Sequence, residues 1–154
     1  MKSLDFIFVG QVKNPAYKML EEFYRERITH YVKSSEVYLV KDSVEKAVLA
    51  RKRKETESIL EKVGEKDILI VCDEFGKSLN SVQFSQKLDS WCGLGPRLVF
   101  VVGGPYGMTE EIKYKCHYSL KLSDWTLPHE LARVVVMEQV YRGFSILKSE
   151  KYHH

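Results

Sequence analysis

Runs of apolar residues alternate with helical patterns along the chain. Five short runs rich in Val, Ile, Leu and Phe predict β-strands over residues 4–10 (LDFIFVG), 36–40 (EVYLV), 67–73 (DILIVCD), 97–104 (RLVFVVGG) and 117–123 (HYSLKLS). Apolar residues at helical spacing predict helices over residues 17–31, 44–63, 82–91, 109–114 and 128–147. Strands that alternate with helices in this way are typical of a mostly parallel sheet with right-handed crossovers.

The apolar runs also indicate how the layers are arranged. LDFIFVG, DILIVCD and RLVFVVG are almost uninterrupted in apolar residues, as expected of strands that are covered on both faces. The last helix is ambiguous, because residues 134–136 are three consecutive valines, but its length and its start at Pro128 favour a helix. We predict one α/β domain over residues 1–154, with a mostly parallel sheet of five to six strands and helices on both faces.

Composition limits the class of protein without fixing its activity. The 154 residues are 44% apolar and 29% charged, as in globular proteins, and the net charge of +3 tolerates a nucleic-acid partner without requiring one. The apolar start is too short for a signal peptide, and no stretch reaches membrane-spanning length, so we expect a cytoplasmic protein with no membrane partner. The three cysteines form no C-x-x-C pair, which argues against a disulfide framework and a metal site.

Three glycine- or proline-bearing loops follow neighbouring predicted strands. They are CDEFGKS after the third strand, GGPYGM after the fourth and LSDWTLP after the fifth. Ligands of open parallel sheets bind beyond the carboxyl ends of the strands, so these loops could surround one crevice. The glycine spacing fits neither a dinucleotide-binding fingerprint nor a P-loop, since Val71 stands where a P-loop requires its first glycine. Tight turns between strands and helices are the alternative interpretation.

Longer motifs give the chain a specific resemblance. GGPYGM, LSDWTLPHELAR, EQVYRG and the terminal YHH occur in an order that resembles the large-subunit rRNA pseudouridine methyltransferase H family, of the SPOUT class. The resemblance extends over nearly the whole chain. It implies an α/β fold with a C-terminal trefoil knot, a homodimer, and S-adenosyl-L-methionine bound in the knot. The implied reaction is methylation of N3 of a pseudouridine in the large-subunit (23S) rRNA, in the stem-loop at the subunit interface of the ribosome.

The same resemblance assigns site residues. It places cofactor contacts at Cys72, Gly103 and the run from 122 to 127, and the loop that includes Gly104 is expected to approach the cofactor too. Cys72 departs from the leucine that is more usual at its position. The predicted cofactor-binding residues are therefore Cys72, Gly103, Gly104, Leu122, Ser123, Asp124, Trp125, Thr126 and Leu127.

Candidate catalytic residues lie near the C-terminus. Glu138 and Arg142 are four apart on the last predicted helix, with the acid N-terminal, which favours an ion pair. A plain surface ion pair is the alternative interpretation. Tyr152 and His153 end the chain, where an aromatic ring and an imidazole can stack on a base or transfer a proton. We expect these four residues to act on the acceptor base.

Five further residues are predicted to contact RNA. Lys13, Lys148 and Lys151 are cations that flank the expected pocket, and His129 and Arg133 are four apart at the start of the last helix. A histidine that only packs locally in the first turn is the alternative for His129. The competing interpretation of the whole protein is a non-catalytic RNA-binding or ribosome-associated module that retains the fold.

Overall fold

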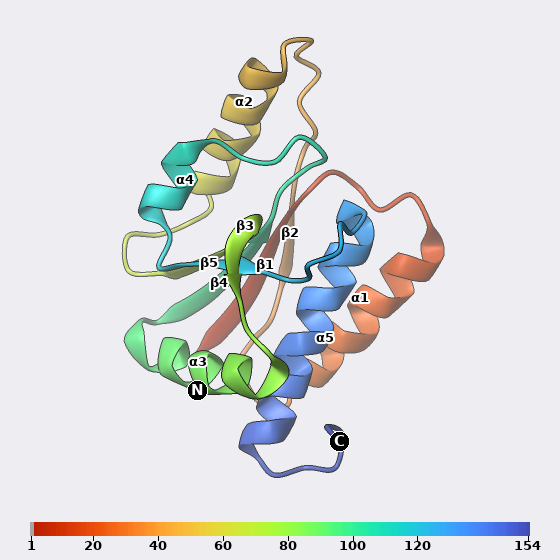
Figure 1. Cartoon of the computed structure of the whole chain (residues 1–154), viewed down its shortest axis with the longest axis vertical. Coiled ribbons are helices and arrows are strands. Elements are labelled where there is room, and N and C mark those ends of the chain that lie inside the picture. Colours follow the sequence, from red (N-terminus) through yellow and green to blue (C-terminus); the bar gives the residue numbers. More distant parts are fainter. Residues whose placement is uncertain (1) are drawn as a thin grey trace.

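A computed structural model describes residues 2–154 of the chain (Figure 1). The strands are β1 (Ser3–Val9), β2 (Val37–Val40), β3 (Ile68–Ser78), β4 (Arg97–Val102) and β5 (Tyr118–Lys121). The helices are α1 (Pro15–Ile28), α2 (Val48–Leu60), α3 (Ser81–Leu94), α4 (Glu110–Lys115) and α5 (His129–Leu147). The strict alternation of strand and helix predicted from the sequence is confirmed.

The five strands form one parallel sheet in the order β2-β1-β4-β3-β5. This agrees with the predicted α/β class and the mostly parallel sheet. The three strands with the most continuous apolar runs, β1, β3 and β4, are the three inner strands, because only inner strands of a parallel sheet lose water on both faces and both edges. The C-terminal trefoil knot implied by the resemblance stays a prediction.

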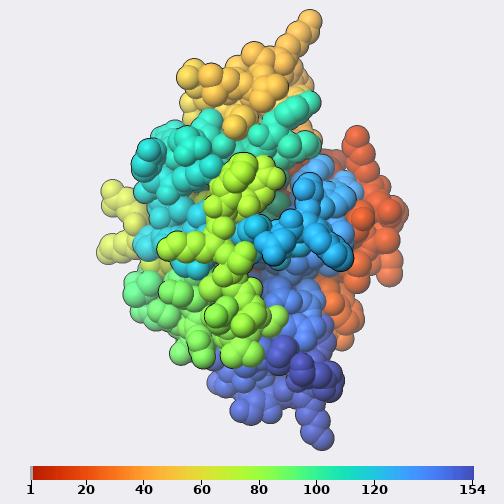
Figure 2. All heavy atoms as spheres, in the orientation of Figure 1, coloured from red at the N-terminus to blue at the C-terminus, as the bar shows by residue number. Residues whose placement is uncertain are grey.

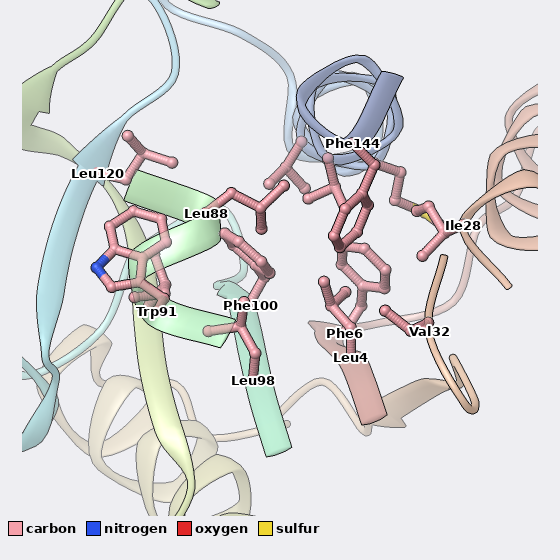
Figure 3. Packing of buried hydrophobic residues seen from close by; sticks show 14 of the residues in the cluster. Leu4, Phe6, Ile28, Val32, Leu88, Trp91, Leu98, Phe100, Leu120 and Phe144 are labelled. Carbon is pink, nitrogen blue, oxygen red and sulfur yellow. The ribbon is translucent and has the colours of Figure 1, made fainter. Parts of the chain in front are cut away.

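Helices cover both faces of the sheet. On one face, α5 lies between α1 and α3, and residues of these helices pack with Phe6, Phe100 and other strand residues in one core (Figure 3). The rings of Phe6 and Phe100 stack with centroids 5.9 Å apart. On the other face, a smaller core joins Ile59 of α2 and Ile112 of α4 to the sheet. In the valine-rich stretch of α5, Val134 and Val136 are buried, and Val136 packs in the larger core with α1 and α3.

Local sequence signals explain where several helices begin. Asn14 caps α1 by accepting a hydrogen bond from the Ala16 N–H at 3.0 Å, and Pro15 occupies the first turn. Asn80 and Gln83 form a reciprocal capping box at the start of α3. Helix α2 is shorter than the predicted 44–63, because its buried residues begin only at Glu55 and the apolar side chain of Val44 is exposed.

A bulge in β3 shapes the sheet edge that carries the site. Cys72 and Lys77 both pair with Leu120 of β5, so residues 73–76 loop out of the ladder between them. A Cβ atom on Gly76 would lie 2.7 Å from the Leu120 carbonyl carbon and 2.8 Å from that of Ser119. Glycine is therefore required there, because the bulge rests directly on the backbone of β5.

Helix α5 is the longest helix, yet neither it nor any other helix within residues 2–154 is long and apolar enough to cross a membrane.

Candidate functional site

A cleft lies at the carboxyl ends of β3, β4 and β5. Its walls are residues 72–75 of the β3 bulge, Val102 at the end of β4, residues 121–127 after β5, and Ala132 of α5. The bulge and the 121–127 segment lie beside each other on the face shown in Figure 2. The cleft volume of about 230 Å³ is below the roughly 300–1,000 Å³ typical of ligand pockets, so a cofactor would fill it and extend through its mouth.

Most of the predicted cofactor-binding residues meet in this cleft. Cys72 and the whole run from Leu122 to Leu127 line it. Gly103 and Gly104 do not: a Cβ on Gly103 would lie 2.9 Å from Met108, and one on Gly104 would lie 3.1 Å from Glu55. These two glycines allow the loop after β4 to pack closely against its neighbours. Their contact with a cofactor stays a prediction.

Sequence reasoning missed several lining residues that the fold adds. Asp73, Glu74 and Phe75 belong to the bulge, and Lys121 and Ala132 flank the predicted run. The CDEFGKS loop was recognised as one wall of a crevice, but its spacing does not reveal that residues 73–76 leave the ladder. The isolated glycine at position 76 was the available sequence signal, because glycine within a strand often marks a bulge.

Carboxylates dominate the charge around the cleft. Asp73, Glu74 and Asp124 line it, and only Lys121 among the lining residues is cationic. Lys121 bonds to Asp124 at 2.6 Å and holds the pKa of that carboxyl below its ordinary value, so Asp124 is ionised at neutral pH. Lys113 reaches Asp73 at 3.2 Å from outside the cleft. The arrangement suits a ligand that carries positive charge.

Cys72, the cysteine that lines the cleft, is not an activated nucleophile. Burial, together with the charge of Asp73, raises the pKa of the Cys72 thiol to about 12. The thiol is therefore protonated at neutral pH and behaves as a small apolar wall residue, because thiolates are the reactive form. Among the described residues, no group of three metal-ligating side chains comes together either. The cleft can bind and orient a ligand by shape and charge.

The four predicted catalytic residues form a second, connected cluster. Arg142 donates from Nη2 and Nε to Glu138 Oε1 at 2.5 and 2.8 Å, and Tyr152 donates its hydroxyl to the same oxygen at 3.1 Å. Arg142 Nη1 lies 3.3 Å from His153 Nδ1. The C-terminal tail is thus docked on α5, and the Tyr152 ring packs 4.6 Å from the ring of Tyr141.

Protonation states in this cluster follow from its hydrogen bonds. Hydrogen bonding to Glu138 raises the pKa of Arg142, so the ion pair persists across the neutral range. Burial raises the pKa of the Tyr152 phenol, with hydrogen bonding and the Glu138 charge adding to it, so the phenol stays protonated. Since a guanidinium has no lone pair, His153 Nδ1 must accept from Arg142, which leaves the proton on Nε2.

The cluster and the cleft are separate within one chain. Both touch α5, the cleft at Ala132 and the cluster at Glu138 and Arg142. Six to ten helical residues correspond to roughly 9–15 Å along the axis. The predicted site residues therefore form two groups, and a single copy of the chain does not bring them into contact.

The residues predicted to contact RNA differ in their exposure to solvent. Lys13, Lys148 and Lys151 are exposed, and His129 is partly exposed in the first turn of α5. The backbone N–H of Lys13 donates to Glu130 Oε1 at 3.1 Å, which ties the loop after β1 to the start of α5. Lys148 and Lys151 lie next to the tail cluster in sequence. These four positions can reach an external ligand.

The prediction for Arg133 is wrong. Its side chain is fully buried, and its Nη2 donates to the backbone carbonyls of Val9 and Gly10. An RNA phosphate cannot reach a guanidinium in this position. The spacing from His129 placed Arg133 near the start of the helix, but its turn of α5 faces the end of β1 rather than solvent.

Glu21 is the buried counter-charge that sequence reasoning missed. Burial raises the pKa of this α1 carboxyl, and the charge of Arg133 opposes that rise. Glu21 Oε1 and Arg133 Nε are both buried without a hydrogen-bond partner among residues 2–154. The two charges are thus coupled through space, and they link α1, β1 and α5 at the end of the sheet.

The fold and the cleft together define a class of protein. The family described as "Predicted SPOUT methyltransferase" matches residues 2–153, and the chain belongs to that family. A solved structure described as a probable methylase family protein from Haemophilus influenzae Rd KW20 has a similar fold, with a TM-score of 0.56. The alignment covers 95% of this chain and 66% of that protein at 15% identity, so it supports the fold alone.

Full-length relatives narrow the family further. Proteins named ribosomal RNA large subunit methyltransferase H are 36% identical in Maridesulfovibrio salexigens, 37% in Flavobacterium psychrophilum and 38% in Hydrogenovibrio crunogenus. Each alignment covers at least 98% of both chains. The resemblance predicted from the sequence motifs is confirmed at the level of the family.

Proposed function

We propose that residues 1–154 act as a single methyltransferase domain that uses S-adenosyl-L-methionine as the methyl donor. The proposed acceptor is N3 of a pseudouridine in large-subunit rRNA. This nucleotide would lie in the stem-loop at the subunit interface of the assembled ribosome. The observation that carries the proposal is the full-length similarity to proteins named for large-subunit rRNA methylation. Such an enzyme would work in the cytoplasm, where ribosomes are found.

The cleft residues fit the cofactor chemically. When bound, S-adenosyl-L-methionine supplies a methyl carbon on a positively charged sulfonium, for in-line displacement. Asp73, Glu74 and Asp124 give the cleft a negative rim that complements this charge. Val102, Leu122 and Leu127 provide apolar surface for the uncharged part of the molecule. These chain residues would hold and orient the donor and exclude water from the reacting atoms.

The tail cluster supplies the groups that act on the acceptor. N3 of the base must lose its proton to a solvent water before it attacks, and the negative charge then spreads to the adjacent carbonyl oxygens. His153, with Nδ1 held by Arg142, presents an Nε2–H that can donate to such an oxygen. Glu138 keeps Arg142 and Tyr152 in position through its shared Oε1. Lys13, His129, Lys148 and Lys151 are proposed contacts for the surrounding RNA.

We further propose that the active form is a homodimer, because the cleft and the tail cluster do not meet in one chain. Helix α1 exposes Met19 at 72%, Leu20 at 40% and Phe23 at 43% beside α5. Met19 and Phe23 are four apart and share one face of the helix. An apolar face of this kind, next to the half-exposed row of α5 that includes Glu138 and Arg142, supports a two-fold contact between copies.

The proposed homodimer can be tested by measuring the mass of the protein in solution. Sedimentation at micromolar concentration should give a species of twice the 17.9 kDa chain. Replacing Met19 and Phe23 by serine should shift the equilibrium towards monomers, since both side chains would lose their apolar contact with the partner copy. The control is Tyr114→Ser, which alters a more exposed ring on α4 and should leave the mass unchanged. A monomeric wild-type protein that is active would contradict the proposal.

Cofactor binding is tested most directly at the bulge. Titration calorimetry of the wild-type protein should detect S-adenosyl-L-methionine binding, and Gly76→Ala should weaken it at least about tenfold, because a Cβ there displaces the bulge from the β5 backbone. Gly93→Ala is the control, since nothing lies within 4 Å of a Cβ at that position.

Methylation should then be compared on free large-subunit RNA, isolated subunits and assembled ribosomes. A wild-type protein that binds RNA but no cofactor would instead be a non-catalytic RNA-binding module.

A further inference from the structure

Two large aromatic side chains at the cleft are almost fully exposed. Phe75 of the bulge is 82% exposed and Trp125 of the 121–127 segment is 83% exposed. Burying either ring would contribute about 1.5–3 kcal/mol, so exposing both at one cleft is unfavourable unless something covers them. Exposed apolar surface concentrated beside a ligand cleft marks an interaction site.

The backbone on both sides of the cleft is well anchored. The bulge that carries Phe75 is fixed at each end by pairing with Leu120, and Gly76 rests on the β5 backbone. The N–H of Trp125 donates to Ser123 Oγ at 3.0 Å in a local turn. The two rings therefore stand on positioned loops that come from neighbouring strands, rather than on loose ends of the chain.

The charge around the rings indicates which part of an RNA they contact. Asp73, Glu74 and Asp124 adjoin the two aromatic residues; Asp73 and Asp124 are paired with Lys113 and Lys121, so Glu74 supplies the net negative charge that repels phosphate groups. Lys113 lies 5.8 Å from the Phe75 ring centre, but it is already paired with Asp73 and Glu110. An uncharged planar group can approach the rings without this repulsion, and unpaired RNA bases stack on aromatic side chains in this manner.

We propose that Phe75 and Trp125 form an aromatic pair that receives an unpaired base of the RNA substrate at the mouth of the cleft and holds it by stacking. This inference rests on the function proposed above, and it assigns substrate positioning to two residues of the cleft wall. The base enters the mouth while its phosphates stay outside the acidic rim. The pair thereby selects a looped-out or single-stranded nucleotide over one inside a helix.

Substitutions separate this role from cofactor binding. Phe75→Leu and Trp125→Leu keep apolar surface and remove the aromatic face, and each should raise KM for the ribosomal substrate by about 5- to 150-fold, the range for loss of one stacked base. The Kd for S-adenosyl-L-methionine should stay within about twofold for Phe75→Leu, because Phe75 is not one of the predicted cofactor-binding residues. Trp125→Phe should restore most of the wild-type KM. Tyr114→Leu is the control, because Tyr114 is 87% exposed on α4 and does not line the cleft.

Intrinsic fluorescence offers a second readout, since the chain has only two tryptophans. Trp91 is 5% exposed, so quenching by a soluble agent reports mainly on Trp125. An RNA hairpin with a uridine-rich loop should protect Trp125 from acrylamide, and a fully paired duplex of the same length should not. Equal protection by both, or loss of cofactor affinity with unchanged KM for RNA in the leucine variants, would overturn the proposal. A wild-type protein without cofactor binding would refute the methyltransferase function instead.

Discussion

Deletion of residues 152–154 is expected to reduce methyl transfer to ribosomes by about two orders of magnitude or more, the effect typical of losing positioning or proton-handling groups. The truncated protein loses the His153 imidazole held by Arg142 and the Tyr152 hydroxyl held by Glu138. The Glu138–Arg142 ion pair lies entirely within α5 and remains. Turnover should fall, therefore, while the Kd for S-adenosyl-L-methionine changes by only a few fold.

Thermal unfolding distinguishes a catalytic tail from a structural one. Tyr152 packs against Tyr141 and the Arg142 guanidinium and makes one hydrogen bond to Glu138, and His153 contacts Arg142, so their loss should lower the free energy of unfolding by about 1–3 kcal/mol. Deletion of His154 alone, which is exposed, is the matched control and should leave both activity and melting temperature unchanged. A truncated protein that melts far below the wild type would show that the tail is structural. Full activity after truncation would place the catalytic group elsewhere.

Arg133→Met should lower the free energy of unfolding by about 3 kcal/mol, the scale of losing one partner from a buried charged pair. The carbonyls of Val9 and Gly10 lose their side-chain donor, and the buried Glu21 carboxyl loses its largest opposing charge. Urea unfolding followed by circular dichroism measures the change. Lys148→Met is the control, because it removes one positive charge from an exposed position.

The pH dependence of this loss has a defined sign. Burial already holds the pKa of Glu21 above its ordinary value, so protonation of Glu21 favours the folded protein as the pH falls through that range. Without Arg133 the pKa of Glu21 in the folded state should rise further. The stability deficit of the variant should therefore be larger at pH 8 than at pH 5, and adding Glu21→Gln should recover part of it. Unchanged stability with a raised KM for rRNA would restore the RNA-contact interpretation of Arg133.

Sequence reasoning was most successful where one signal dominates. Continuous apolar runs in β1, β3 and β4 predicted strands covered on both faces, and these strands are the three inner strands of the sheet. The helical assignment of α5 was also correct, despite the valines at 134–136, since length and the Pro128 start outweighed β-branching. Residues 72–75 and 121–127 were correctly expected at one crevice, because parallel strands bring their carboxyl ends to one edge, although residues 72–75 lie in a bulge of β3 and not in a loop after it.

Other features depend on contacts that no local pattern encodes. Arg133 looks like a surface cation from its spacing to His129, but its side chain is buried against the carbonyls of Val9 and Gly10, which lie 124 and 123 residues earlier in the chain. Nor does the spacing of Cys72 and Lys77 show that both pair with Leu120. The separation of the cleft from the tail cluster also depends on the fold and could not be predicted from the sequence. The ion pair between Glu138 and Arg142 was predicted correctly, because their i, i+4 spacing places them on one face of α5.

The β3 bulge forms a wall of the cleft whose residues can be replaced as a short cassette, independently of the rest of the sheet. Because the ladder resumes at Lys77 against the same Leu120 that pairs with Cys72, residues 73–75 can change in number or identity without shifting the register of β3 or β5. Gly76 would stay as the fixed end of the cassette, where it meets the β5 backbone. Libraries confined to these three positions would therefore vary the shape and charge of the cleft mouth while the sheet and both cores are left intact.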